Sequence, residues 1–404
     1  MLIISSYSSS SSSVYVICTM DKRNETKDGY KKTLARNKTL HNEQSSRHSD
    51  ARSIESIDRT DGRMPTPDVD VDAPRARALR LRWIVNATAW NPSEDEFEFI
   101  LQSLLPPHES DAVRRFRRME DRKRAVLSRL MQRNAIARAC AANGVGGAEE
   151  EAMKTTRALR GLDVRRTKGS KPFFAVRLGL AHAPNFNFNV SHEGDYVVLA
   201  SETHAVVGVD VAAPGQVRRV TEAASAETDV EALLETFKGV LTEREVTAIR
   251  ETAREKGERA GEELFRKHWS LKEAHVKAVG VGLGMDLKRC EFVIDDASST
   301  ARVIVDGTPR PDWSFHMQAF PPIVEDAVPR ENRHWITVSR GPLSDVVDAN
   351  GEFTGVVFSR RDFTVDEWSS VLHAASPPWE LLTVGDLIPL DGRDAYEEAG
   401  GVLY

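Results

Sequence analysis

The stretch Trp269-Ser270-Leu271-Lys272-Glu273-Ala274-His275-Val276-Lys277-Ala278 decides how the rest of the chain is interpreted. At 3.6 residues per turn it predicts an amphipathic helix, with Leu271 and two alanines on a buried stripe. Trp269, Glu273 and Lys277 share a different face, and the glycines that follow end the helix. Taken alone, this face is explained by a solvated ion pair, worth about 0.2–0.5 kcal/mol.

Length and composition exclude several classes of protein. The chain has 404 residues, 40% of them hydrophobic, which is enough for two ordinary domains with a substantial core. Its net charge of -6 argues against a general nucleic-acid binder. The widely spaced Cys18, Cys140 and Cys290 form no metal or disulfide pattern, which favours a reducing compartment, and we expect a cytoplasmic protein. No apolar run approaches the roughly 20 residues of a membrane span.

Residues 1–77 are polar, with serine unbroken from Ser8 to Ser13, and we expect a disordered low-complexity extension. Residues 1–20 contain no Lys or Arg, so neither a secretory signal nor a transit peptide is indicated. Organellar targeting, and an over-extended start with Met20 as the initiator, stay open as alternatives.

The rest of the chain alternates helix and strand patterns. Ser93, three residues before Glu96, predicts a helix start, and two prolines at 106–107 end that helix. We expect one long basic helix over 109–142. Strands are expected at 78–85, 185–192, 195–201, 205–211, 289–294, 301–305, 313–319 and 334–338, helices at 230–238 and 242–256, loops at 143–151 and 212–229, and short elements at 363–372 and 379–387.

Three charged features are each ambiguous alone. The basic helix reads as a solvated face or as a site for an anionic ligand. The turn between Arg165 and Phe173 is a basic surface turn or a phosphate grip. Asp210, near the end of an apolar strand, is costly to bury unless it is paired or holds a metal.

Taken together, three blocks resemble the 4′-phosphopantetheinyl transferases of the larger, two-lobed type, closest to the animal cytosolic form. The blocks are 186–196, 207–211 and 269–273 with Lys277, and the resemblance covers about 80–340. It implies an α/β (α+β) fold of two similar lobes related by a pseudo-twofold, with the active site in the cleft. We therefore divide the chain into lobes at 78–204 and 205–340 and a tail, 341–404, packed on the body, and we expect a monomer.

The resemblance also implies a reaction. The 4′-phosphopantetheine arm of coenzyme A moves to a serine of an apo acyl or peptidyl carrier protein, with Mg²⁺, and 3′,5′-ADP leaves. Asp210 and Glu273 match the metal carboxylates, Glu273 is the candidate base, and Lys277 matches a lysine at the coenzyme A phosphates. A bacterial third acid is replaced by Ala212, where we expect water, as in the animal type.

The remaining implied residues bind the cofactor. They are Arg166, Lys168 and Lys171 in the basic turn, Asn189, Ser191 and His192 in the second block, and Arg114 or Arg115 in the basic helix. Lys272 also matches a family position, without a clear role. The alternative is a catalytically silent relative that binds coenzyme A or a carrier protein. A different nucleotide-dependent enzyme would be expected to show a phosphate-binding loop or a dinucleotide fingerprint, and the sequence has neither.

Overall fold

The computed structural model describes residues 70, 73–142, 155–215, 229–321 and 333–403, and two paired N-terminal strands, β1 (Ser6–Ser9) and β2 (Ser12–Tyr15). Most of the predicted disordered extension lies outside these residues, as do the predicted loop at 143–151 and most of that at 212–229. Within 1–77 the structure describes β1, β2 and the short helix α2 (Pro74–Arg77).

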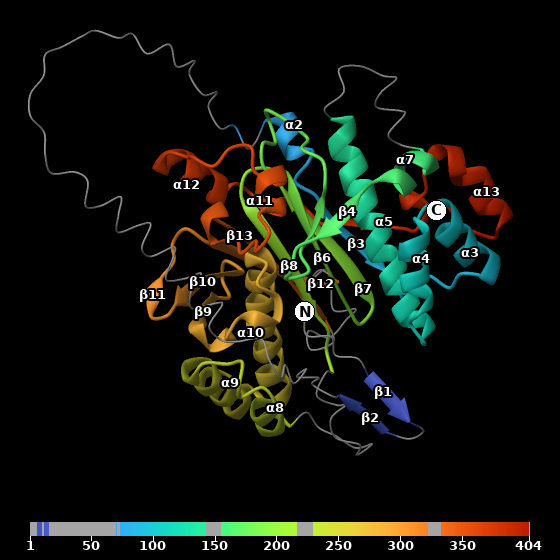
Figure 1. Cartoon of the computed structure of the whole chain (residues 1–404). Coiled ribbons are helices and arrows are strands. Elements are labelled where there is room, and N and C mark those ends of the chain that lie inside the picture. Colours follow the sequence, from blue (N-terminus) through green and yellow to red (C-terminus); the bar gives the residue numbers. More distant parts are fainter. Residues whose placement is uncertain are drawn as a thin grey trace, which may run out of the picture.

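The N-terminal half is built on a four-stranded sheet in the order β14, β3, β7, β6. Its strands are β3 (Arg82–Asn86), β6 (Asn187–Glu193), β7 (Tyr196–Glu202) and β14 (Glu380–Leu382). Helix α5 (Met119–Ala141) packs on this sheet, near α3 (Glu94–Ser103), α4 (Pro107–Arg114) and α7 (Thr156–Gly161) (Figure 1). A two-stranded ribbon, β4 (Val164–Arg166) and β5 (Pro172–Phe174), carries the basic turn.

The C-terminal half has a six-stranded sheet, β11-β10-β12-β13-β8, with β9 paired to β10. Its strands are β8 (Val206–Ala212), β9 (Cys290–Asp295), β10 (Thr300–Val305), β11 (Thr308–Pro309), β12 (Ser314–Phe320) and β13 (His334–Gly341). The helices are α8 (Val230–Thr236), α9 (Glu243–Lys256) and α10 (Glu258–Val279), with 3-10 turns at 282–284 and 287–289. Together the two halves confirm the α+β fold class.

Helix α10 lies directly on β8 because Gly208 has no side chain. A Cβ at Gly208 would stand 2.0 Å from the carbonyl oxygen of Ala274 and 2.6 Å from the amide of Ala278. The motif Val-Gly-Val-Asp is therefore a packing motif as well as a site motif, since its glycine sets how closely the helix approaches the strand.

The two sheets meet at a seam with an unusual bonding pattern. On one face, valines of β7 and β8 join Ile84 and Ile336 in a shared buried cluster. Along the edge, four alternate polar side chains of β6 accept hydrogen bonds from alternate backbone N–H groups of β8 and of Ala213, which follows it. The pairs are Asn187 with Val207 (2.9 Å), Asn189 with Val209 (3.1 Å), Ser191 with Val211 (3.4 Å) and Glu193 with Ala213 (2.8 Å). This side-chain ladder fixes the register of one half against the other.

The helix and strand predictions are largely confirmed, with three corrections. Ser93 caps α3 and Thr242 caps α9, as side-chain acceptors. The predicted helix 109–142 is two helices, because residues 115–118 form a turn in which Arg122 donates to the carbonyls of Phe116 and Arg114. The first strand begins at Arg82 rather than at 78, and α10 begins eleven residues before Trp269, at Glu258.

The tail differs most from the expected surface packing, because it forms part of both halves. It contains α11 (Glu352–Val357), α12 (Val365–His373), β14 and α13 (Arg393–Glu398), with 3-10 turns at 343–345, 385–387 and 390–392. β14 pairs in parallel with β3, and the buried Tyr396 donates to Glu96 of α3 (2.6 Å). Figure 1 shows α11 and α12 beside the C-terminal sheet and α13 on the far side, against α3.

Candidate active site

The centre of the site is a buried aspartate bonded from two directions. Asp210 Oδ1 accepts hydrogen bonds from Ser191 Oγ (2.9 Å) and from Lys277 Nζ (2.6 Å), and Lys277 Nζ also donates to Ser191 Oγ (2.8 Å). Ser191 comes from β6, Asp210 from β8 and Lys277 from the last turn of α10. The fold thus brings together one predicted residue from each of the three sequence blocks.

The two carboxylate oxygens of Asp210 differ in their hydrogen bonding. Asp210 Oδ2 is buried and has no hydrogen-bond partner in the described part of the chain. A buried carboxylate oxygen without a partner is costly, and hard divalent cations such as Mg²⁺ prefer such oxygen donors. The residues therefore fit a metal, although no group of three or more His, Cys, Asp or Glu among the described residues has the arrangement of a metal cluster.

Glu273, one turn before Lys277, is the second acid of the site. Burial and the negative charge of Asp210 raise the pKa of the Glu273 carboxyl, against the opposing charge of Lys277. Burial alone would lower the pKa of the Lys277 ammonium, but Asp210 and Glu273 raise it. Lys277 forms its ion pair with Asp210 rather than with Glu273, so the solvated i,i+4 pair is not what this helix face contains.

The turn between β6 and β7 closes one side of the site. The protein packed around the His192 ring, together with the cations Lys277 and Arg124, lowers the pKa of that ring. Arg124 of α5 donates to the carbonyl of Gly194 (2.9 Å), and Glu193 raises the pKa of Lys277 by its charge. The sequence analysis missed Arg124 and Glu193. The polar alternation along β6 is the signal that could have identified Glu193.

The basic turn presents two of its three predicted cofactor residues to solvent. Arg166 and Lys168 are exposed, and Arg166 donates to the Ser170 carbonyl (3.2 Å). Lys171 is only 2% exposed, and its Nζ donates to the carbonyl oxygens of Val207 (2.6 Å) and Lys277 (3.2 Å). The structure therefore turns Lys171 towards the protein interior.

Arg114, the arginine expected from the basic helix, lies on the surface beside α3. Its guanidinium pairs with Glu98 (2.6 Å). Further along α5, Arg129 and Arg133 flank Glu109 (3.8 and 2.9 Å). Burial lowers the pKa of Arg129, and the charge of Arg166 lowers it further. This group holds more positive than negative charge, and the sequence offered no register to identify it.

Two neighbours of the site residues have structural roles. Trp269 is buried against Phe237 and Phe265, so it does not share the half-buried face of Glu273. Lys272 is fully buried on the other side of α10, where it pairs with Glu245 (2.9 Å) and donates to the carbonyl of Leu287 (3.1 Å). Lys272 therefore anchors the segment before β9 instead of facing a ligand.

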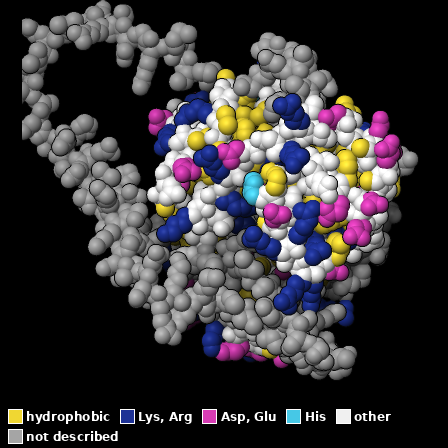
Figure 2. Space-filling view, turned by 45° about the vertical axis from the view of Figure 1, so that its right-hand side comes forward, with side chains coloured by type: hydrophobic (Ala, Val, Ile, Leu, Met, Phe, Trp, Pro, Cys, Tyr) yellow, Lys and Arg dark blue, Asp and Glu magenta, His cyan; other side chains and the backbone are white. Residues whose placement is uncertain are grey.

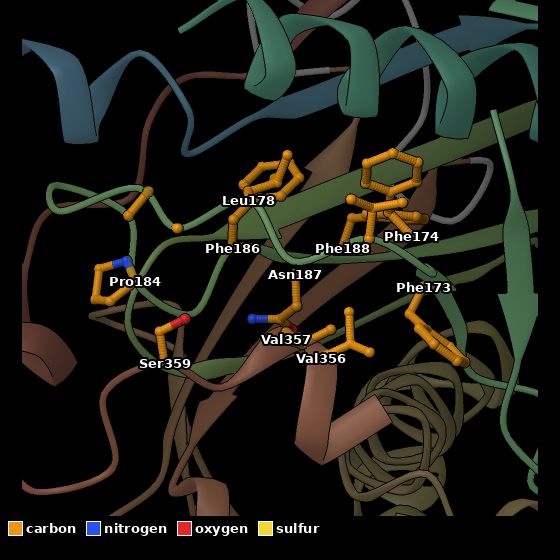
Figure 3. A pocket seen from close by; sticks show the side chains of 13 residues that line it. Phe173, Phe174, Leu178, Pro184, Phe186, Asn187, Phe188, Val356, Val357 and Ser359 are labelled. Atoms are coloured by element: carbon orange, nitrogen blue, oxygen red, sulfur yellow. The ribbon is translucent and has the colours of Figure 1, made fainter. Parts of the chain in front are cut away.

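The surface charge and an apolar pocket differ in character from the site around Asp210. Figure 2 shows a face on which basic and acidic side chains are interspersed, so charge recognition there is local. A pocket between β5, β6 and α11 is lined by aromatic and aliphatic side chains, including Phe173, Phe186 and Val356 (Figure 3). Its lining contains no ionisable side chain, so it is not where the chemistry above takes place. No helix in the described residues is long and apolar enough to cross a membrane.

Comparison with known proteins gives consistent matches along both halves. Residues 88–204 match the family model "4′-phosphopantetheinyl transferase, N-terminal", and residues 206–338 match "4′-phosphopantetheinyl transferase superfamily". The chain is 30% identical over 245 residues to the rat L-aminoadipate-semialdehyde dehydrogenase-phosphopantetheinyl transferase, covering 58% of this chain and 69% of that protein. It is 29% identical over 308 residues to the mouse protein of the same name, covering 74% and 86%. A phosphopantetheinyl transferase of a Thraustochytrium species is 31% identical over 238 residues, covering 58% and 73%.

Proposed function

The chain belongs to the 4′-phosphopantetheinyl transferase superfamily. We propose that it uses Asp210, Lys277 and Glu273 to transfer the phosphopantetheine arm of coenzyme A to a serine of a carrier protein. The observation that supports this proposal most is the carboxylate of Asp210, at the place where both halves meet. Its Oδ2 has no hydrogen-bond partner among the described residues, while its Oδ1 accepts a hydrogen bond from Lys277. A metal-ready carboxylate next to a fixed cation suits the cleavage of a pyrophosphate.

The transfer makes one bond and breaks one bond. The serine oxygen of the carrier attacks the phosphorus that bears the pantetheine arm, and the bond from that phosphorus to the bridging oxygen breaks. The 3′,5′-ADP leaves with the bridging oxygen. Glu273, one turn before Lys277 on α10, takes the serine proton as the general base.

Asp210 and Glu273 are the residues that would hold Mg²⁺, which supplies charge neutralisation at the phosphate oxygens when it is bound. Lys277 donates towards the negative charge that develops on the leaving phosphate, and Ser191 holds both Lys277 and Asp210 in place. Ala212 contributes no acid, so water would fill the position that a third carboxylate would otherwise take.

The nucleotide end of coenzyme A meets the exposed cations of the basic turn. Arg166 and Lys168 stand there, with Asn189, Ser191 and His192 of β6 on the site side. Arg129 replaces Arg114 as the arginine of the basic helix in this proposal, because Glu109, which Arg129 and Arg133 flank, also acts electrostatically on Arg166. Guanidinium groups bind phosphate through paired hydrogen bonds. The carrier is an apo acyl or peptidyl carrier domain, such as that implied by the aminoadipate-semialdehyde dehydrogenase relatives, and the enzyme acts as a cytoplasmic monomer.

Arm transfer to a purified carrier tests the function directly. The full chain is incubated with coenzyme A, Mg²⁺ and an apo carrier protein, and the carrier is weighed by mass spectrometry. We expect the mass of the added arm with the wild type, and a 10²–10⁴-fold slower transfer with Glu273→Gln, which keeps the size of the side chain but removes the base. The silent relative, which only binds, gives coenzyme A binding without any gain in carrier mass.

A further inference from the structure

The last turn of α10 exposes carbonyl groups that the helix itself cannot satisfy. Two of them are met from outside the helix. Lys171 Nζ donates to the carbonyl oxygen of Lys277 (3.2 Å), and the backbone N–H of Val347 donates to the carbonyl oxygen of Val279 (2.8 Å). Because a helix carries partial negative charge at its C-terminus, an ammonium group is a favourable partner there.

Lys171 holds more than the helix end. Its Nζ also donates to the carbonyl oxygen of Val207 in β8 (2.6 Å), and the ring of Phe353 in α11 lies 5.7 Å from the same nitrogen. Lys171 therefore connects the basic turn, the strand of Asp210, the helix of Lys277 and the tail. With only 2% of its surface exposed, it does not present its charge to a ligand in solvent.

The backbone around Lys171 also packs against the C-terminal end of α10. A Cβ at Gly169 would stand 1.8 Å from the carbonyl oxygen of Gly280, so the turn touches the end of α10 directly. The Lys171 side chain passes close to Gly280 as well, with its Cδ 3.6 Å from where a Cβ of Gly280 would be. The contact between the turn and the helix end is thus close enough to fix one against the other.

We propose that Lys171 is a positioning residue for the transfer reaction, which fixes the last turn of α10, and with it Lys277, against β8, and does not bind the coenzyme A phosphates. This proposal rests on the proposed function. It replaces the phosphate contact that the sequence suggested for Lys171, and it leaves Arg166 and Lys168 of the same turn as the phosphate contacts.

The two roles predict different kinetics. Lys171→Met keeps the approximate length of the side chain and removes the ammonium group that makes both hydrogen bonds. Lys168→Met removes one exposed charge from the same turn. For Lys171→Met we expect kcat to fall about 10²-fold, the loss typical of a displacement near 1 Å, with KM for coenzyme A within twofold of wild type. For Lys168→Met we expect the reverse pattern, a raised KM and a near-normal kcat. Lys171→Gln, which can still donate to one carbonyl, should fall between Lys171→Met and wild type in kcat.

Hydrogen exchange in the full chain provides a readout that needs no activity. Lys171→Met should speed amide exchange in the last turn of α10 and at Gly280, and Lys168→Met should leave it unchanged. A tenfold rise in KM for coenzyme A with unchanged kcat in Lys171→Met would overturn the proposal, as would unchanged exchange at the helix end. Loss of the folded state in both Lys171→Met and Lys171→Gln would also overturn it, because Lys171 would then be a folding residue. If the wild type transfers no arm, the proposed function fails, while the exchange comparison still tests the position of α10.

Discussion

Removal of Asn187 should weaken the seam between the two halves. Asn187 is 2% exposed, and its side chain makes three hydrogen bonds. Oδ1 accepts from Val207 N (2.9 Å), and Nδ2 donates to the carbonyl oxygens of Asn185 and Ala205 (both 2.8 Å). The variant Asn187→Ala leaves one buried N–H group and two buried carbonyl groups without this partner.

The expected cost follows from those three bonds. An unsatisfied buried donor costs about 1–3 kcal/mol, and each lost neutral hydrogen bond removes about 0.5–1.5 kcal/mol. We therefore expect Asn187→Ala to lower the free energy of unfolding by about 2–6 kcal/mol. Asn189→Ala removes the single acceptor of Val209 N and should cost less, about 1–3 kcal/mol.

Urea unfolding of the full chain, followed by both tryptophan fluorescence and far-ultraviolet circular dichroism, measures this loss. The matched control is Asn350→Ala, since Asn350 is exposed and should change stability by less than about 0.5 kcal/mol. Non-coincident transitions from the two probes would mean that the halves unfold separately once the seam is weakened. If the Asn187→Ala midpoint equals that of the control, the ladder does not stabilise the seam and the reasoning is wrong.

Three further predictions concern charge and the tail. Burial raises the pKa of Glu202, but Arg82, Arg80 and Arg340 hold it at about 2, so its stabilising effect of roughly 3 kcal/mol is present above pH 4.5 and is lost as the pH falls towards 2. The free energy of unfolding of Glu202→Gln should therefore change less with pH in that window than that of the wild type. At neutral pH it should already be lower by about 3–5 kcal/mol, because the arginines remain buried. Arg129→Ala should raise KM for coenzyme A about tenfold or more in steady-state kinetics, whereas Arg114→Ala, the control, should keep the wild-type KM. Equal KM values for the two variants would show that Arg129 does not bind coenzyme A. Truncation after residue 378 deletes β14 and Tyr396 and should abolish a cooperative thermal transition, whereas retention of the wild-type transition would show that the tail is dispensable.

Sequence patterns were sufficient where local signals and the fold agree. The helix of Glu273, the strand of Asp210 and the cap at Ser93 all depend on neighbouring residues, and each lies where such signals indicate. The ladder could not be predicted in the same way. Its pairs lie 20 residues apart, and alternating polar residues on a strand ordinarily indicate contact with solvent.

Charged residues caused the largest differences between sequence and structure. Arg82 alternates with apolar residues, which is typical of a solvated strand face, yet its side chain is buried in an ion pair with Glu202, which is distant in sequence. Lys171 belongs to a visibly basic turn, but its ammonium group bonds to carbonyls of two distant elements. Sequence gives the charge of a residue and not the partner that the fold supplies, so burial of these cations could not be read in advance.

The position of β14 has a consequence for how the protein is made. The sheet of the N-terminal half gains its outer strand from residues 380–382, and its core gains Tyr396, after the whole C-terminal half has been synthesised. A ribosome releases chain from the N-terminus onward, so the first half emerges with β3 as an open edge and waits for its last strand. The sheet of the C-terminal half, whose strands are contiguous in sequence from β8 to β13, is complete earlier. Folding of the two halves is therefore expected to finish in the opposite order to their synthesis.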